Sequence, residues 1–170
     1  GEVGFSLAKY LSSEGLQVTV IDEDLEKLNK MTAAIDVRSI VGKTYNPAIL
    51  DEAGVKSADL LIAVSDNDES NITACKMAKI LFDIPNTIAR IKEKELLNEK
   101  WLDLFTNKGF KIDNIISPEN EVANMLARLV AVSGAHDLIS FAEDKVRLIG
   151  LKLDENCPVL DTPLGQLTEL

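Results

Sequence analysis

GEVGFSLAKYLSSEGLQVTVID, residues 1–22, is the stretch that decides the fold. Gly1 and Gly4 have the spacing of the last two glycines in a G-x-G-x-x-G turn. Helical apolar spacing follows the turn at Leu7 and Leu11, and an apolar β-branched run then ends at Asp22. A glycine turn, a helix, a strand and an acid in this order indicate half of a phosphate-binding strand–turn–helix unit, whose first glycine and first strand are missing.

Composition excludes several classes of function. The 170 residues carry 18 basic and 28 acidic side chains, a net charge of -10, which argues against binding to nucleic acid or to a membrane surface through a basic patch. Cys75 and Cys157 lack a nearby second ligand and are expected to be reduced thiols. No apolar run approaches the roughly 18 residues that span a bilayer. We expect a cytoplasmic protein that needs a partner to hold it if it works at a membrane.

Short apolar strands alternate with helical segments along most of the chain. The predicted strands are 17–21, 37–41, 60–64, 87–91 and 111–115. Asn46-Pro47 and Gly54 delimit a short helix between two of them, and Ser117-Pro118-Glu119 opens another, predicted over 118–132. The alternation predicts an α/β Rossmann-like fold, a parallel sheet with helices on both faces.

The pattern changes after Gly134. Two β-rich runs, 138–142 and 146–153, flank Glu143-Asp144-Lys145 and predict an antiparallel hairpin. We therefore predict a nucleotide-binding domain over residues 1–142, including the helix 118–132, and the truncated start of a small α+β domain over residues 143–170.

Three polar positions at strand ends are candidates for ligand binding. Asp22 is placed to accept hydrogen bonds from the ribose hydroxyls of NAD. It could instead cap the next helix, although Asp24 can also fill that role. Ser65 and Asp66 follow the strand 60–64 and could bind a nucleotide or simply begin a helix. Arg90 lies in an apolar strand, where its charge needs a phosphate or a carboxylate partner.

Catalytic sets are not found in the sequence. His136 is the only histidine, and no Ser-His-Asp set or cluster with metal-ligand spacing can be assembled around it. We expect no enzyme activity and no metal site.

Several motifs together resemble the TrkA family of NAD-binding regulatory subunits of bacterial potassium uptake, of the KTN/RCK class. They are GEVG, Asp22 after its strand, Val41-Gly42, Ser65-Asp66-Asn67-Asp68-Glu69-Ser70-Asn71, Ile88-Ala89-Arg90-Ile91 and Ile116-Ser117-Pro118-Glu119. The resemblance covers almost the whole chain. It implies that NAD(H) is the cofactor, with ATP or ADP as further candidates for the same site.

The resemblance also assigns roles to individual residues. It implies that Gly1, Glu2 and Val3 bind the pyrophosphate and Asp22 the ribose. It implies that Lys43, Ser65 and Asp66 surround the adenosine. It also implies that Arg90 lies near the phosphates.

Assembly is a further implication of the resemblance. Family members form a homodimer or a tetrameric ring beneath a membrane potassium-transporting subunit of the TrkH or TrkG type, and the helix 118–132 resembles their crossover helix. The first strand of the family, expected mid-sheet, is absent here and should leave two unpaired strand edges. The alternatives to a regulatory sensor are a small NAD-dependent dehydrogenase fragment without its substrate domain, and a ligand-free structural ring subunit.

Overall fold

The computed structural model describes residues 1–131, 135–141, 145–153, 155, 157, 160 and 163. It divides into two compact units, Gly1–Pro118 and Glu119–Leu170, which are considered separately. The predicted domain boundary at residue 142 stays a prediction.

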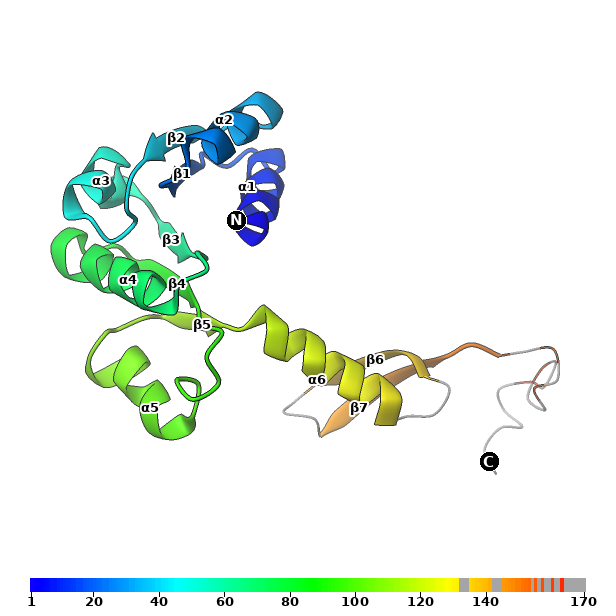
Figure 1. The fold of residues 1–170 in the computed structure, drawn as a ribbon. Helices are drawn as coiled ribbons and strands as arrows, with labels where there is room; N and C mark the ends of the chain where they lie inside the picture. Colours follow the sequence, from blue (N-terminus) through cyan, green and yellow to red (C-terminus); the bar gives the residue numbers. More distant parts are fainter. Residues whose placement is uncertain are drawn as a thin grey trace. The chain divides into compact units, whose positions relative to one another are not determined.

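Helices and strands alternate through the first unit, as predicted (Figure 1). Its elements are α1 (Glu2–Ser13), β1 (Thr19–Asp22), α2 (Leu25–Ala34), β2 (Arg38–Val41), α3 (Pro47–Glu52), the 3-10 turn η1 (Val55–Ser57), β3 (Leu60–Ala63), α4 (Asp68–Phe82), β4 (Asn86–Arg90), α5 (Glu99–Asp103), the π-helical turn η2 (Leu104–Lys108) and β5 (Asn114–Ile116).

All strand pairs of the first unit are parallel, which confirms the predicted α/β class. β1 pairs with β2 in one sheet, while β3, β4 and β5 form a second sheet in that order. Among the described residues no hydrogen-bond ladder joins β1 to β3. Each of these two strands therefore has one unpaired edge, as the sequence predicts.

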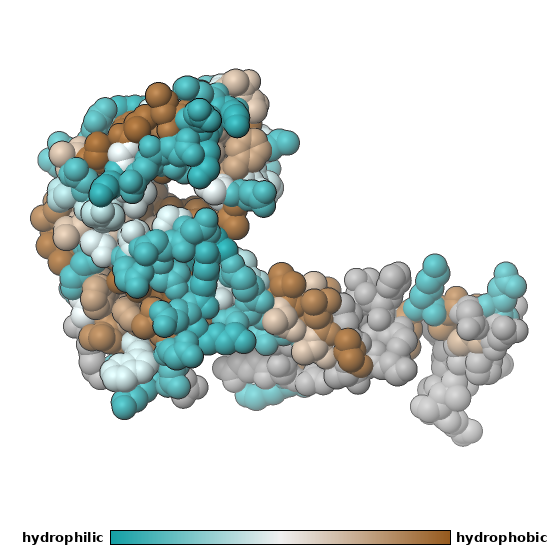
Figure 2. Space-filling view, in the orientation of Figure 1, coloured by the Kyte–Doolittle hydropathy of each residue, from teal (hydrophilic) through white to brown (hydrophobic). Residues whose placement is uncertain are grey.

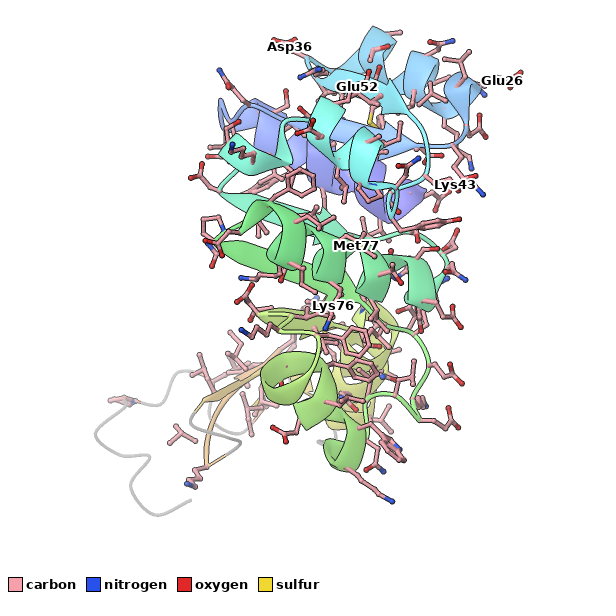
Figure 3. The ribbon with its side chains drawn as sticks, turned by 90° about the vertical axis from the view of Figure 1, so that its left-hand side faces the viewer. Glu26, Asp36, Lys43, Glu52, Lys76 and Met77 are labelled. Carbon is pink, nitrogen blue, oxygen red and sulfur yellow. The ribbon has the colours of Figure 1, made fainter. Side chains whose placement is uncertain are left out.

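α4 is the central packing element of the first unit, lying against β3 and β4. Small buried residues on its inner face, Ala74, Cys75 and Ala78, let the helix approach the sheet closely. Burial raises the pKa of the Cys75 thiol to about 12, so this cysteine stays protonated and unreactive. Lys76, also in α4 and labelled in Figure 3, donates a hydrogen bond to the carbonyl of Gly109 and so fixes the segment after η2.

Local sequence signals set the helix ends. The side chains of Asp24, Asn46 and Asn67 cap α2, α3 and α4, respectively. Pro47 occupies the first turn of α3, as predicted. Gly54 has a φ of 80°, in the left-handed region that glycine adopts readily, and ends that segment.

The second unit contains α6 (Pro118–Ala131), β6 (Ala135–Phe141) and β7 (Val146–Leu151). β6 and β7 are antiparallel, which confirms the predicted hairpin. Exposed apolar side chains line α6 at helical spacing: Val122, Met125, Leu126 and Val130 (Figure 2). The predicted ends at Val132 and Ala142 lie outside the described residues.

The start of α6 lies where the sequence predicts it. The helix begins at Pro118, but the buried Ser117 hydroxyl has no hydrogen-bond partner and so does not cap it. Within the described part of the chain, no helix is long and apolar enough to cross a membrane.

A polar cluster joins β4, β5 and the end of α4. Oδ2 of Asp113 accepts hydrogen bonds from Thr87 N at 2.6 Å and Thr87 Oγ1 at 2.8 Å, and lies 2.8 Å from Lys79 Nζ. Burial raises the pKa of Asp113, but the hydrogen bonds from Lys79 and Thr87 outweigh this effect and hold the pKa below its usual value. The charged form of Asp113 therefore stabilises the fold.

Asp113→Asn should lower the free energy of unfolding by about 1 kcal/mol near pH 7, a modest value because the carboxylate is partly open to water. A lowered folded-state pKa adds stability above the ordinary aspartate pKa of about 3.9, and this stability is lost as the pH falls through the folded-state value. Urea unfolding across pH 2.5–7 should show the difference from wild type shrinking at acid pH. Asp51→Asn, at an exposed acid of α3, is the control, and an equal loss there would contradict the assignment.

Candidate functional site

Three segments far apart in the sequence meet at the start of α1. The backbone nitrogen of Gly1 lies 3.6 Å from Oδ2 of Asp22, at the carboxyl end of β1. A Cβ atom placed on Gly1 would lie 3.8 Å from Oδ2 of Asp66, in the loop after β3. Figure 1 shows the N-terminus beside that loop. The structure thus brings together Gly1, Asp22 and Asp66 at the ends of parallel strands, where α/β folds bind ligands.

The start of α1 has no side-chain cap. Gly1 occupies the N-cap position and makes no side-chain hydrogen bond, whereas side chains cap α2, α3 and α4. The first backbone amides of α1 are therefore available to an anion. Glu2, in the first turn, is exposed and Val3 is half-buried. Gly4 lies close to the residue after β3, since a Cβ on Gly4 would make an ordinary van der Waals contact with Cγ2 of Val64 at 3.5 Å.

Asp22 is not needed as a helix cap. The side chain of Asp24 accepts hydrogen bonds from the backbone amides of Glu26 and Lys27 and so caps α2. Asp22 uses only Oδ1 locally, to accept a hydrogen bond from Asp24 N at 3.0 Å. Its side chain is 26% exposed and its Oδ2 atom faces Gly1. Asp24, and not Asp22, is therefore the residue that caps α2.

Ser65 is held by a buried side chain of α4 that the sequence analysis did not assign to the site. Oδ1 of Asn71, a residue 1% exposed, accepts hydrogen bonds from Ser65 N at 2.9 Å and Ser65 Oγ at 2.7 Å. Nδ2 of Asn71 donates to the carbonyls of Ser65 at 3.0 Å and Arg90 at 2.9 Å. One side chain thus fixes the loops after β3 and β4 relative to each other.

Asp66 contacts two cations. Its Oδ1 atom lies 2.8 Å from Lys92 Nζ and 3.5 Å from Arg90 Nη1. The hydrogen bond from Lys92 lowers the pKa of Asp66 below its usual value, and the Arg90 charge acts in the same direction. Of the two partners predicted for Arg90, a phosphate or a carboxylate, the structure contains the carboxylate. The Arg90 side chain is 10% exposed, whereas that of Asp66 is 81% exposed.

Asp68 fixes the backbone that carries Lys92. Its buried Oδ2 atom accepts hydrogen bonds from Lys92 N and Glu93 N, each at 2.9 Å. Asp68 and Asn71 lie in the first turns of α4, so this helix start holds the chain from Arg90 to Glu93. Lys92 was not predicted from the sequence, although its position two residues after Arg90 places it on the same side of an extended chain.

Lys43 lies at the periphery of this region. It is exposed in the loop after β2, and its Nζ atom lies 5.7 Å from the centroid of the Tyr45 ring. Interaction with Tyr45, and then the charge of Glu23, raise the pKa of Lys43. Tyr45 also lines a shallow groove of about 270 Å³ with three residues of α4, namely Glu69, Ser70 and Thr73. Figure 3 shows Lys43 where this loop faces the start of α4.

The chain is similar to known proteins over its whole length. Residues 1–118 match the model of the TrkA-N domain. The Trk system potassium uptake protein TrkA of Azorhizobium caulinodans is 40% identical over 170 residues, which are 100% of this chain and 37% of the relative. The chain therefore spans little more than a third of the length of that relative.

Solved structures share the fold at lower identity. The TrkA-N domain of the inner membrane protein ybaL from Escherichia coli has a TM-score of 0.65 and 21% identity, covering 76% of this chain and 90% of that one. The GsuK channel bound to NAD has a TM-score of 0.63 and 16% identity, covering 84% of this chain and 24% of that one.

Asn71→Ala should lower the free energy of unfolding by about 2–4 kcal/mol, because it leaves buried groups of Ser65 and Arg90 without partners. Urea unfolding should show this loss, and hydrogen exchange of the Ser65 amide should accelerate. Asn67→Ala removes only a helix cap and should cost about 1 kcal/mol. A loss at Asn71 no larger than the loss at Asn67 would mean that the loops do not depend on Asn71.

Proposed function

The chain belongs to the TrkA-N domain family, and from this premise we propose that it is part of a regulatory subunit that binds NAD(H) and controls a membrane protein transporting potassium. The observation that carries the proposal is the meeting of the uncapped start of α1 with Asp22 at the end of β1. Backbone amides beside a carboxylate suit a ligand that carries both phosphates and ribose hydroxyls.

We assign the phosphates to the start of α1. The backbone of Gly1, Glu2 and Val3 would hold the pyrophosphate, and Arg90 would supply positive charge on the opposite side. In support, the α1 amides have no side-chain cap, and the nearly buried Arg90 charge is directed toward the Asp66 carboxylate. A helix N-terminus and a guanidinium are both suited to phosphate oxygens.

We assign the adenosine to the region between β1, β2 and α4. Asp22 would accept hydrogen bonds from the ribose hydroxyls, and its negative charge would disfavour the 2′-phosphate of NADP. Ser65, fixed by Asn71, and Lys43 would lie on the adenine side, where the groove beside Tyr45 offers space for a flat ring. Asp66 stays in the site, but its two cation contacts support a different role, which is argued below. ATP or ADP would compete for the same residues.

Bound NAD(H) supplies a nicotinamide whose redox state can be sensed, and the chain needs no catalytic group to sense it. Binding changes a transporter only if the ligand has different affinities for two conformations of the subunit. We infer that the protein is not an enzyme. In support, the relative that is 40% identical is named as a potassium uptake protein, and the described residues contain no group of three or more side chains that could hold a metal ion.

For assembly, we propose a homodimer or tetrameric ring attached from the cytoplasmic side to a transporter of the TrkH or TrkG type. The domains proposed are residues 1–142 for nucleotide binding, with the crossover helix 118–132, and residues 143–170 as the start of a second domain. The exposed apolar side chains of α6 support a role of this helix in pairing.

NADH should bind to the protein without being consumed. Titration calorimetry measures binding, and absorbance of the nicotinamide band, followed with a panel of hydroxy acids and aldehydes, measures turnover. Steady NADH consumption would support the dehydrogenase alternative, whereas no binding at all would support the ligand-free structural subunit.

Asp22→Ala should weaken NAD(H) binding by about 1–3 kcal/mol, because the ribose hydroxyls lose their acceptor. Asp24→Ala, two residues away, removes the α2 cap and leaves the site carboxylate in place, so its affinity for NADH should match wild type. Calorimetric titration of both variants makes the comparison. Equal NADH affinities of the two variants would show that Asp22 does not contact the ligand.

A further inference from the structure

Asp66 is an anion located where the proposed function expects phosphate. Its Oδ2 atom lies 3.8 Å from the position that a Cβ atom on Gly1, the N-cap of α1, would take. Its Oδ1 atom is paired with Lys92 and Arg90. The carboxylate thus lies near both the N-cap of α1 and two positive side chains, and helix N-termini and cations are groups that bind phosphate in proteins.

The two cations are fixed more firmly than the anion. Asp68 holds the Lys92 backbone, Asn71 holds the Arg90 carbonyl, and the Arg90 side chain is only 10% exposed. The Asp66 side chain is 81% exposed, so it can rotate into water without breaking the packing of the loop. Exposed ion pairs are weak and screened by salt, so a ligand with more negative charge can replace this carboxylate.

We propose that Asp66 is an internal competitor of the phosphate groups: it occupies Lys92 and Arg90 in the free protein and leaves them when an anionic nucleotide binds. The inference rests on the proposed function and deepens it, since it makes Asp66 a determinant of ligand charge instead of an adenosine contact. A ligand without phosphates does not displace Asp66. When a nucleotide binds, the contacts of its phosphates with Lys92 and Arg90 must offset the loss of the Asp66 ion pairs.

Replacing the carboxylate by an amide tests the proposal. Asp66→Asn should tighten the binding of inorganic pyrophosphate and of NADH about two- to fivefold, the range of an exposed ion pair, and should leave adenosine binding unchanged. Calorimetry at low salt measures all three ligands. Glu93→Gln is the matched control, because it removes the same charge from an exposed side chain nearby and leaves the pairs of Asp66 with Lys92 and Arg90 in place.

Each other outcome counts against the proposal. Weaker adenosine binding by Asp66→Asn would show that Asp66 contacts the adenosine. An equal gain in pyrophosphate affinity in Glu93→Gln would show that the effect comes only from the change in net charge. Failure of pyrophosphate to bind to either wild type or Asp66→Asn would also overturn it. The proposed function is tested separately by NADH binding to wild type, which can succeed when the Asp66 proposal fails.

Lys92→Gln adds an internal check on the mechanism. The gain in phosphate affinity from Asp66→Asn should disappear when Lys92 is also replaced, because the main cation for which Asp66 and the phosphates compete is then absent. A gain that persists in the double variant would show that Asp66 acts through another group.

Discussion

The two loops of the site depend on one constraint, the hydrogen bonding of the buried Asn71 amide. β3 and β4 have only four and five residues, and the chain leaves the sheet with backbone groups that need partners. Asn71 supplies partners to Ser65 on one side and to the Arg90 carbonyl on the other. The relative position of the two loops is therefore set by α4, which is anchored in the core by Ala74, Cys75 and Ala78.

The electrostatics of the site follow from placing a few cations in an acidic chain. With a net charge of -10, the molecule as a whole repels anions, so phosphate binding needs local compensation. Arg90 and Lys92 provide it from one loop and the α1 amides from the other side. A nearly buried guanidinium without an anion would be unfavourable, and Asp66 supplies one in the free protein.

Much of the fold could be predicted because it depends on local patterns. Apolar runs located the strands to within a few residues, Pro47 and Gly54 delimited α3, and Asp22 stood at the expected strand end. Contacts between distant residues could not be predicted. Thr87 and Asp113 are 26 residues apart, as are Asp66 and Lys92, and no periodicity encodes such pairs. Asn71 stood in the sequence only as the last residue of the Ser65–Asn71 motif, and nothing in that motif indicated that its side chain holds both loops.

The β4–β5 ladder connects Arg90 to the residues that precede α6. Arg90 pairs with Ile116 in the β4–β5 ladder, and the Ile91 amide donates to the Ile116 carbonyl at 2.9 Å. Ser117 and then the first residue of α6 follow directly. The Ser117 hydroxyl is buried without a hydrogen-bond partner, so an arrangement that gives it one gains free energy that the present one lacks. The strand that carries Arg90 and the residues that lead into α6 are therefore joined through one strand pair.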